Sequence, residues 1–196
     1  MNLNELAKEA HQIAVEHGWW SPEPSFGDLV ALMHSELSEA LEEYRAGRPM
    51  LWYSFDVSDA CCEPGHYHYN VHCCRGCGHR GYKPEGIAVE LADCIIRILD
   101  FFGNSCVDID GIIERKKNAK IEVPENFGDM IARLHMDLSM AYDTEYRKTV
   151  SVMKLIFCIM RIHKWATKNN VDMEPIIRKK MAYNRTRPYR HGGKLL

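Results

Sequence analysis

Ile87-Ala88-Val89-Glu90-Leu91-Ala92-Asp93-Cys94-Ile95-Ile96-Arg97 decides the fold, and His34-Ser35-Glu36-Leu37-Ser38-Glu39-Ala40-Leu41-Glu42-Glu43-Tyr44-Arg45 has the same design. Each stretch has a helical period and carries two acids three residues apart, Glu90 with Asp93 and Glu36 with Glu39. Such residues share one helix face. That face also carries the apolar stripe, where a bare carboxylate is costly. A hard divalent cation, Mg²⁺ or Mn²⁺, is the simplest compensation for four carboxylates.

The remaining text is also helical in period. Apolar spacing and end signals predict a first helix ending at Gly18, then helices over about 26–46, 84–103, 108–119, 127–147, 149–169 and 172–184. We expect no strand outside the cysteine-rich segment, and an irregular, basic tail from Arg185 to Lys194. The sequence therefore predicts an all-α fold.

Composition excludes several classes of protein. The net charge of −2 gives no sign of bulk affinity for nucleic acid or membranes. No apolar run is long enough to span a bilayer. The first residues are amphipathic and of mixed charge, unlike a signal peptide. We expect a cytoplasmic protein without a membrane partner, and nucleic acid is disfavoured as a partner.

The second half of the chain repeats the first. Phe26 and the twelve residues after it align with Phe127 and its successors at an offset of 101 residues, whereas Leu91 aligns with Leu155 at an offset of 64. The difference, 37 residues, locates an insertion in the first copy at about 48–83. We expect two similar helical units, 1–120 and 121–196, packed with pseudo-twofold symmetry around one core.

The four acids are not repeated. Their counterparts in the second copy, in order, are Asp137, Met140, Lys154 and Phe157. Replacement by Met and Phe predicts apolar surroundings at these positions, so the acids of the first copy should also face inward. We therefore expect one acidic metal site per chain and a degenerate second unit.

Five of the eight cysteines lie between Cys61 and Cys77. In a reducing compartment, Cys-x-x-Cys spacing indicates zinc. Cys74 and Cys77, with Gly78, resemble one knuckle of a zinc ribbon. For the other half Cys61, Cys62, His66 and His79 compete, and we select Cys62 and His66. The alternative is a flexible loop with free thiols.

With these motifs, the chain resembles the MazG-like branch of the all-α nucleoside triphosphate pyrophosphohydrolases, a superfamily that includes dimeric dUTPases and dCTP pyrophosphatases. Three segments carry the resemblance: Glu36-Leu37-Ser38-Glu39, Glu90-Leu91-Ala92-Asp93 and the ending Lys180-Met181-Ala182-Tyr183-Asn184-Arg185-Thr186-Arg187. It implies Mg²⁺-dependent cleavage of a nucleoside triphosphate between the α and β phosphates, catalysed through Glu36, Glu39, Glu90 and Asp93. It also raises the option of a homodimer.

The resemblance has three departures. The spacing between the acidic motifs is long, the first copy lacks the full basic ending, and the second copy keeps that ending without the acids. We therefore expect a complementary site, in which the first copy supplies the acids and the second copy supplies phosphate ligands, Lys180, Asn184 and Arg187.

Several residues also have a purely structural interpretation. Trp19 and Trp20 could stack on a base or pack beside the Pro-rich turn, and His34 has a structural role because His135 repeats it. Glu42 and Glu43 support the site or are solvated. The alternative function is a catalytically weak relic whose zinc-dependent insertion binds nucleic acid or protein. A di-iron bundle is disfavoured because neither Glu36 nor Glu90 has a histidine three residues later.

Overall fold

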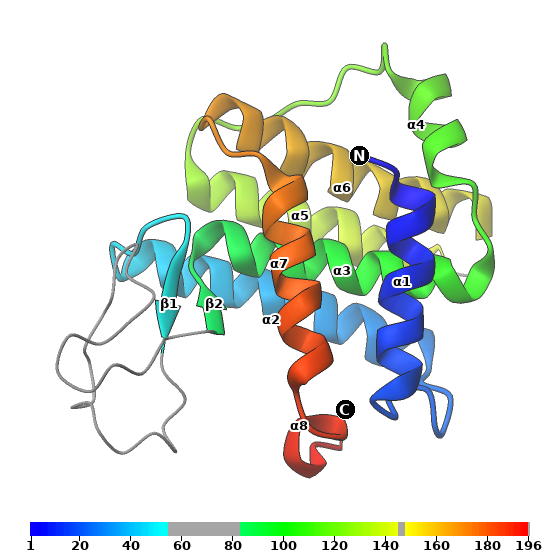
Figure 1. Ribbon diagram of the computed structural model, residues 1–196. Coiled ribbons are helices and arrows are strands. Elements are labelled where there is room, and N and C mark those ends of the chain that lie inside the picture. The colour runs from blue at the N-terminus through cyan, green and yellow to red at the C-terminus, as the bar shows by residue number, and fades with distance from the viewer. Residues whose placement is uncertain (55–82, 145–147, 196) are drawn as a thin grey trace, which may run out of the picture.

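The computed structural model describes residues 1–54, 83–144 and 148–195, and there the chain is all-α apart from two short strands (Figure 1). The elements in order are α1 (Leu3–Glu16), α2 (Phe26–Arg45), β1 (Trp52–Ser54), β2 (Lys83–Glu85), α3 (Ile87–Ser105), α4 (Ile109–Lys116), α5 (Phe127–Asp143), α6 (Lys148–Lys168), α7 (Met173–Thr186) and α8 (Arg190–Gly193). None of these helices is long and apolar enough to cross a membrane. The predicted fold class is therefore confirmed at the level of an all-α chain.

Local chemistry sets the helix starts. Ser25 and Asp28 form a reciprocal capping box at α2, and Asn126 caps α5 by accepting a hydrogen bond from the backbone N–H of Asp129. Gly86, at the start of α3, has φ +116°, and a Cβ there would lie 2.7 Å from the carbonyl oxygen of Pro49. Only glycine fits this close approach, which presses the start of α3 against the end of the α2 connection.

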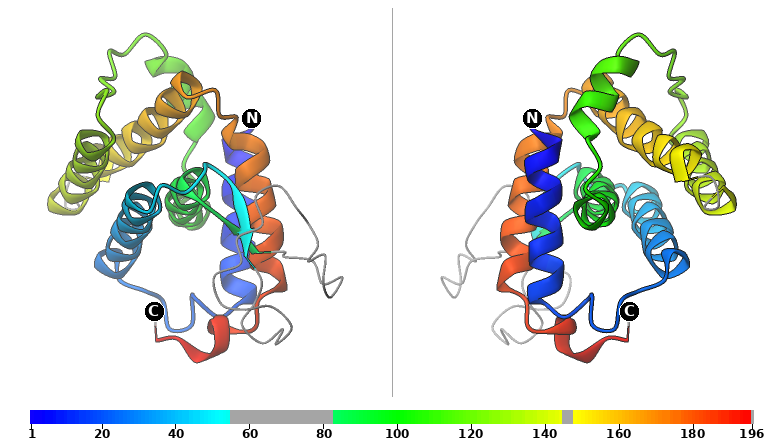
Figure 2. Two further views of the ribbon diagram at one scale, coloured as in Figure 1. Left: turned by 90° about the vertical axis from the view of Figure 1, so that its left-hand side faces the viewer. Right: turned by 90° about the vertical axis from the view of Figure 1, so that its right-hand side faces the viewer.

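The helices form three layers (Figure 2). One layer is α5 with α6, the middle layer is α2 with α3, and α1 with α7 cross the middle layer on its other side. A single cluster of buried apolar residues runs through all three layers, from Leu6 through Leu91 to Leu134. The last helix of the sequence repeat, α7, thus lies against α3 of the first half rather than beside α6.

The expectation of no strand outside the cysteine-rich segment was wrong. Strands β1 and β2 pair antiparallel, with Trp52 opposite Glu85, and bring the two ends of the 55–82 segment together. The predicted start of a helix at Pro84 was also wrong, because Pro84 lies in β2. The proposed zinc ligands lie outside the described residues: Cys62, His66, Cys74 and Cys77.

Two ion pairs link neighbouring helices at positions that are equivalent in the sequence repeat. Arg97 of α3 donates to Glu36 of α2 at 2.5 Å, and Arg161 of α6 donates to Asp137 of α5 at 3.0 Å. Asp137 and Arg161 are both buried, at 4% and 6% exposure. Buried charges are tolerated when they are paired in this way.

Candidate metal and phosphate site

A cavity of about 470 Å³ lies between α1, α2, α3, α7 and the C-terminal tail. This volume is in the range of small-molecule sites. All four predicted acids line it, as do the three predicted phosphate ligands. Residues 36 and 180, far apart in the sequence, thus meet at one place because α7 packs on α3.

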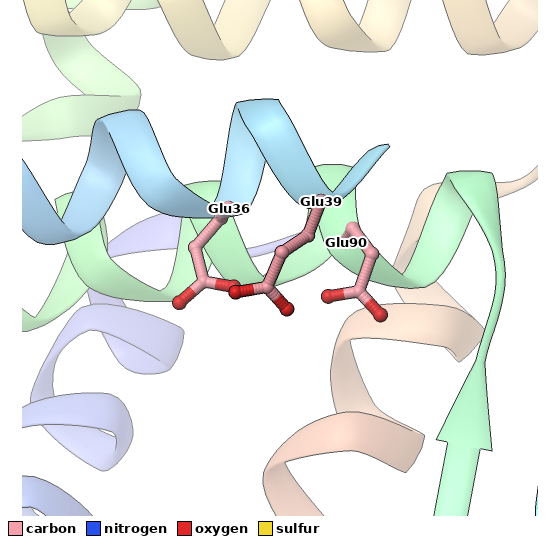
Figure 3. A group of neighbouring side chains, drawn as sticks. All are labelled: Glu36, Glu39 and Glu90. Carbon is pink, nitrogen blue, oxygen red and sulfur yellow. The ribbon is translucent and has the colours of Figure 1, made fainter. Parts of the chain in front are cut away.

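Three of the four acids form a cluster (Figure 3). One carboxylate oxygen each from Glu36, Glu39 and Glu90 lies within 4.8 Å of the others. Glu36 and Glu39 come from successive turns of α2, and Glu90 comes from the first turn of α3. Oxygen ligands at this spacing suit a hard divalent cation.

Asp93, the fourth acid, is held differently. Its Oδ2 lies 2.8 Å from the Nζ of Lys180, and both side chains are largely buried. Asp93 is therefore outside the three-carboxylate group and positions a cation beside it. The sequence predicted four equivalent ligands, whereas the structure places three together and gives the fourth an ion-pair partner.

When ionised, the four acids carry more negative charge than the neighbouring cations balance. Glu90 is 4% exposed, and burial raises its pKa to about 9, although Lys180 opposes the shift. Burial also raises the pKa of Glu36, against the pull of Arg97. Four ionised acids facing two cations, Arg97 and Lys180, would leave two negative charges in excess. One divalent cation would balance them, so the donor set fits Mg²⁺ or Mn²⁺ in charge and in ligand type.

Lys180, which lies next to these acids, is held in its charged form. Burial alone would lower the pKa of Lys180, but Asp93 and Glu90 outweigh burial and raise it. The Nζ atom also lies 3.5 Å from the carbonyl oxygen of Pro84. Lys180 therefore stays protonated in the cavity wall.

The other predicted phosphate ligands also line the cavity. The Oδ1 of Asn184 is buried and accepts no hydrogen bond from any described residue. Arg187 stacks its guanidinium over Tyr183 at 5.9 Å from the ring centroid. Arg190 and Lys194 line the same wall, so the tail gives this end a positive potential.

That positive potential shows in His191. Burial and the charges of Arg187 and Arg97 lower its pKa to about 3. Its ring meets Trp19 edge to face at 5.0 Å. A neutral imidazole and an aromatic surface therefore lie beside the basic wall, which is an environment that favours an anionic ligand.

One sequence inference about orientation was wrong. Met140 is 38% exposed, so its position in the second copy is not an apolar interior. Its counterpart Glu39 is exposed as well, and no described residue forms an ion pair or hydrogen bond with it. The inward orientation holds for Glu36, Glu90 and Asp93 but not for Glu39. Glu39 is the exposed acid of the cluster.

Three other residues considered from the sequence, Glu42, Glu43 and His34, have contacts of a structural kind. Glu43 accepts a hydrogen bond from the indole N–H of Trp52 at 2.7 Å, which ties α2 to β1, while Glu42 pairs with Arg45 at the surface. The Nδ1 atoms of His34 and His135 lie 2.7 Å apart where α2 meets α5. A structural role for His34 is consistent with this contact.

Sequence reasoning missed the residues beyond Asp93 on α3. Arg97 and Asp100 continue the face of Glu90 and Asp93 at helical spacing and line the cavity. Trp20 donates its indole N–H to Asp100 at 2.9 Å, so it packs beside the turn and also lines the cavity. Extending the i, i+3, i+7 pattern past the acidic motif would have identified both residues of α3.

Comparison with known proteins adds no relative. No family model, curated protein or solved structure matches the chain significantly.

Proposed function

We propose that this chain is an Mg²⁺- or Mn²⁺-dependent nucleoside triphosphate pyrophosphohydrolase that releases pyrophosphate and a nucleoside monophosphate. One observation carries the proposal: a cluster of three carboxylates and several basic side chains line one cavity. Carboxylates suit the metal of a metal–triphosphate complex, and Lys and Arg suit its phosphates.

Each side chain then has a role that its surroundings support. Glu36, Glu39 and Glu90 would hold the cation, which when bound would neutralise phosphate charge and lower the pKa of a water ligand. Lys180, held by Asp93, would face the charge that develops on departing pyrophosphate. Arg187 would bind a phosphate oxygen as a planar donor, and the Asn184 amide would orient the substrate.

The two-unit organisation belongs to the same proposal, with 1–120 as the unit that carries the acids and 121–196 as the degenerate unit. The matched pairs Glu36–Arg97 and Asp137–Arg161 support it, because each joins repeat-equivalent positions. In the second unit, Arg161 also donates to the carbonyl oxygen of Glu122. The backbone before α5 thus lies beside the Asp137–Arg161 pair. The equivalent Glu36–Arg97 pair of the first unit instead lines the cavity.

Zinc in the insertion remains a separate proposal with its own measurement. Metal analysis of the purified protein should find about one zinc per chain if Cys62, His66, Cys74 and Cys77 bind it. Zinc should persist when Glu39 is replaced, because the two metal sites use different ligand sets.

The test of activity is pyrophosphate release from a panel of nucleoside triphosphates with Mg²⁺. Glu39→Ala should lower kcat by about 100-fold or more, as loss of a central electrostatic group does, without unfolding the protein, because Glu39 is exposed. Glu42→Ala is the matched control, one turn along α2 and exposed, and should keep wild-type activity. Absence of turnover by folded wild-type protein on every nucleotide would refute the proposal and favour the binding-module alternative.

A further inference from the structure

The cavity has a second end beyond the metal-site acids, where several aromatic and aliphatic side chains lie. Helices α2 and α3 run antiparallel, since Glu39 faces Glu90, Glu36 faces Arg97 and Phe26 contacts Phe101. Residues between these contacts therefore lie progressively farther from the metal cluster. The side chains that line this end include Trp20, Leu29, Leu32 and Ile96, together with the acids Asp28 and Asp100.

The distance between the two ends suits a nucleoside. Asp100 follows Asp93 by seven residues, about two turns, so both lie on one face and about 10 Å apart along the axis of α3. A nucleoside spans a distance of this order from its 5′ oxygen to the far edge of its base. A triphosphate bound at the acids would therefore place its base beside Asp100.

Asp100 has one carboxylate oxygen committed and one free. Its Oδ1 accepts the indole N–H of Trp20 at 2.9 Å and lies 2.9 Å from the Nδ1 of His11. Its Oδ2 accepts no hydrogen bond from the described part of the chain. The side chain is 13% exposed and lines the cavity, so Oδ2 is accessible to a ligand that binds there.

The free oxygen is held in place and charged near neutral pH. Burial raises the pKa of Asp100 to about 6, against the hydrogen bonds from His11 and Trp20. Those two bonds come from α1 and from the turn that follows it. The carboxylate is thus oriented before any ligand binds, which lowers the entropic cost of using it for recognition.

We propose that Oδ2 of Asp100 selects the base of the substrate by accepting a hydrogen bond from an exocyclic amino group. The inference rests on the proposed function, and it names the substrate class as triphosphates of amino-bearing bases such as cytosine and adenine. In uracil, the ring N–H lies between two carbonyl oxygens whose lone pairs repel a carboxylate. An amino group projects beyond the ring and offers two N–H donors.

The first measurement uses the wild-type protein and pairs of nucleotides that differ by an amino group against an oxygen. Values of kcat/KM for dCTP should exceed those for dUTP by about tenfold to 100-fold, the range expected of a hydrogen bond to a charged group. The same preference should hold for dATP over dITP. Equal values within both pairs would overturn the proposal without any variant.

Asp100→Asn is the matched variant. Its amide can still accept from Trp20, but it presents an N–H₂ donor in place of Oδ2. The preference should therefore fall to near one or reverse, with dUTP gaining as dCTP loses. Glu42→Gln, at an exposed position of α2, is the control and should keep the preference. A uniform loss on all nucleotides in Asp100→Asn, with a native circular dichroism spectrum, would assign Asp100 a structural role and refute the inference.

Binding separates this inference from the proposed function. Trp20 lines the cavity, so quenching of tryptophan fluorescence should report the binding of CMP and UMP without metal or turnover. Tighter binding of CMP in the wild type, lost in Asp100→Asn, would support base selection even if no nucleotide is hydrolysed. Turnover with no difference between CMP and UMP would leave the proposed function intact and overturn the role of Asp100.

Discussion

Replacing Glu90 with Gln should stabilise the metal-free protein while weakening its response to metal. Glu90 is buried, and its pKa of about 9 lies far above its ordinary value of 4.5. Between these two values the folded protein binds a proton that the unfolded chain has released, so the free energy of unfolding falls as pH rises. At pH 7 the 2.5-unit gap corresponds to about 3 kcal/mol. Gln is neutral at every pH and removes this cost.

The assay is urea unfolding at pH 5, 7 and 8.5 in the presence of EDTA. The wild type should lose stability across this series, and Glu90→Gln should lose less. At pH 7 the variant should melt about 6–12 °C higher, given the usual response of a chain of this size. Glu42→Gln, at an exposed position of α2, is the control and should follow the wild type.

Metal addition completes the experiment. Mg²⁺ should raise the melting temperature of the wild type by mass action, because it binds the folded cluster, and should do so much less in Glu90→Gln. A variant less stable than the wild type at pH 7 in EDTA would refute the reasoning. So would a pH dependence of unfolding that is unchanged by the substitution.

Two further predictions concern residues outside the cavity. Asp137→Ala leaves Arg161 buried without its carboxylate, so it should lower the free energy of unfolding by about 3–5 kcal/mol in urea titrations. Because the pair lies in α5 and α6, kcat/KM of the folded fraction should stay at the wild-type value, and a large loss of kcat/KM would contradict this assignment. Gly103→Ala places a Cβ 2.4 Å from the backbone oxygen of Ala7, so it should lower stability by about 1–3 kcal/mol through overpacking of α1 on α3. Gly27→Ala, where the nearest atom is 3.4 Å away, is its control, and equal melting temperatures for the two variants would contradict the overpacking argument.

Helical periodicity predicted most of the fold because nearly every helix buries a wide apolar stripe. The end of α2 and the starts of α5 and α7 follow from local capping signals that act within a few residues. The strands could not be predicted in this way. Each has three residues, too few to show alternation, and β2 contains Pro84, which ordinarily argues against a strand.

The acids that line the cavity could be predicted from the sequence. Which of them cluster and which pairs with a cation could not. Spacing along a helix places Glu36 beside Glu39 and Glu90 beside Asp93 without any knowledge of the partner helices. Whether Asp93 binds a metal or pairs with Lys180 depends on where α7 docks, which is a tertiary fact. The inference that Met140 marks an apolar interior failed for a related reason. A single apolar residue is often exposed at a protein surface, so its identity says little about its burial.

The docking of α7 on α3 also has a consequence for biosynthesis. Glu36 and Glu90 are synthesised well before Lys180, so the growing chain carries these acids without their cationic partner. Contacts over such a separation form late, because the intervening loop must close first. The acidic half of the chain therefore cannot complete its cavity until α7 has left the ribosome.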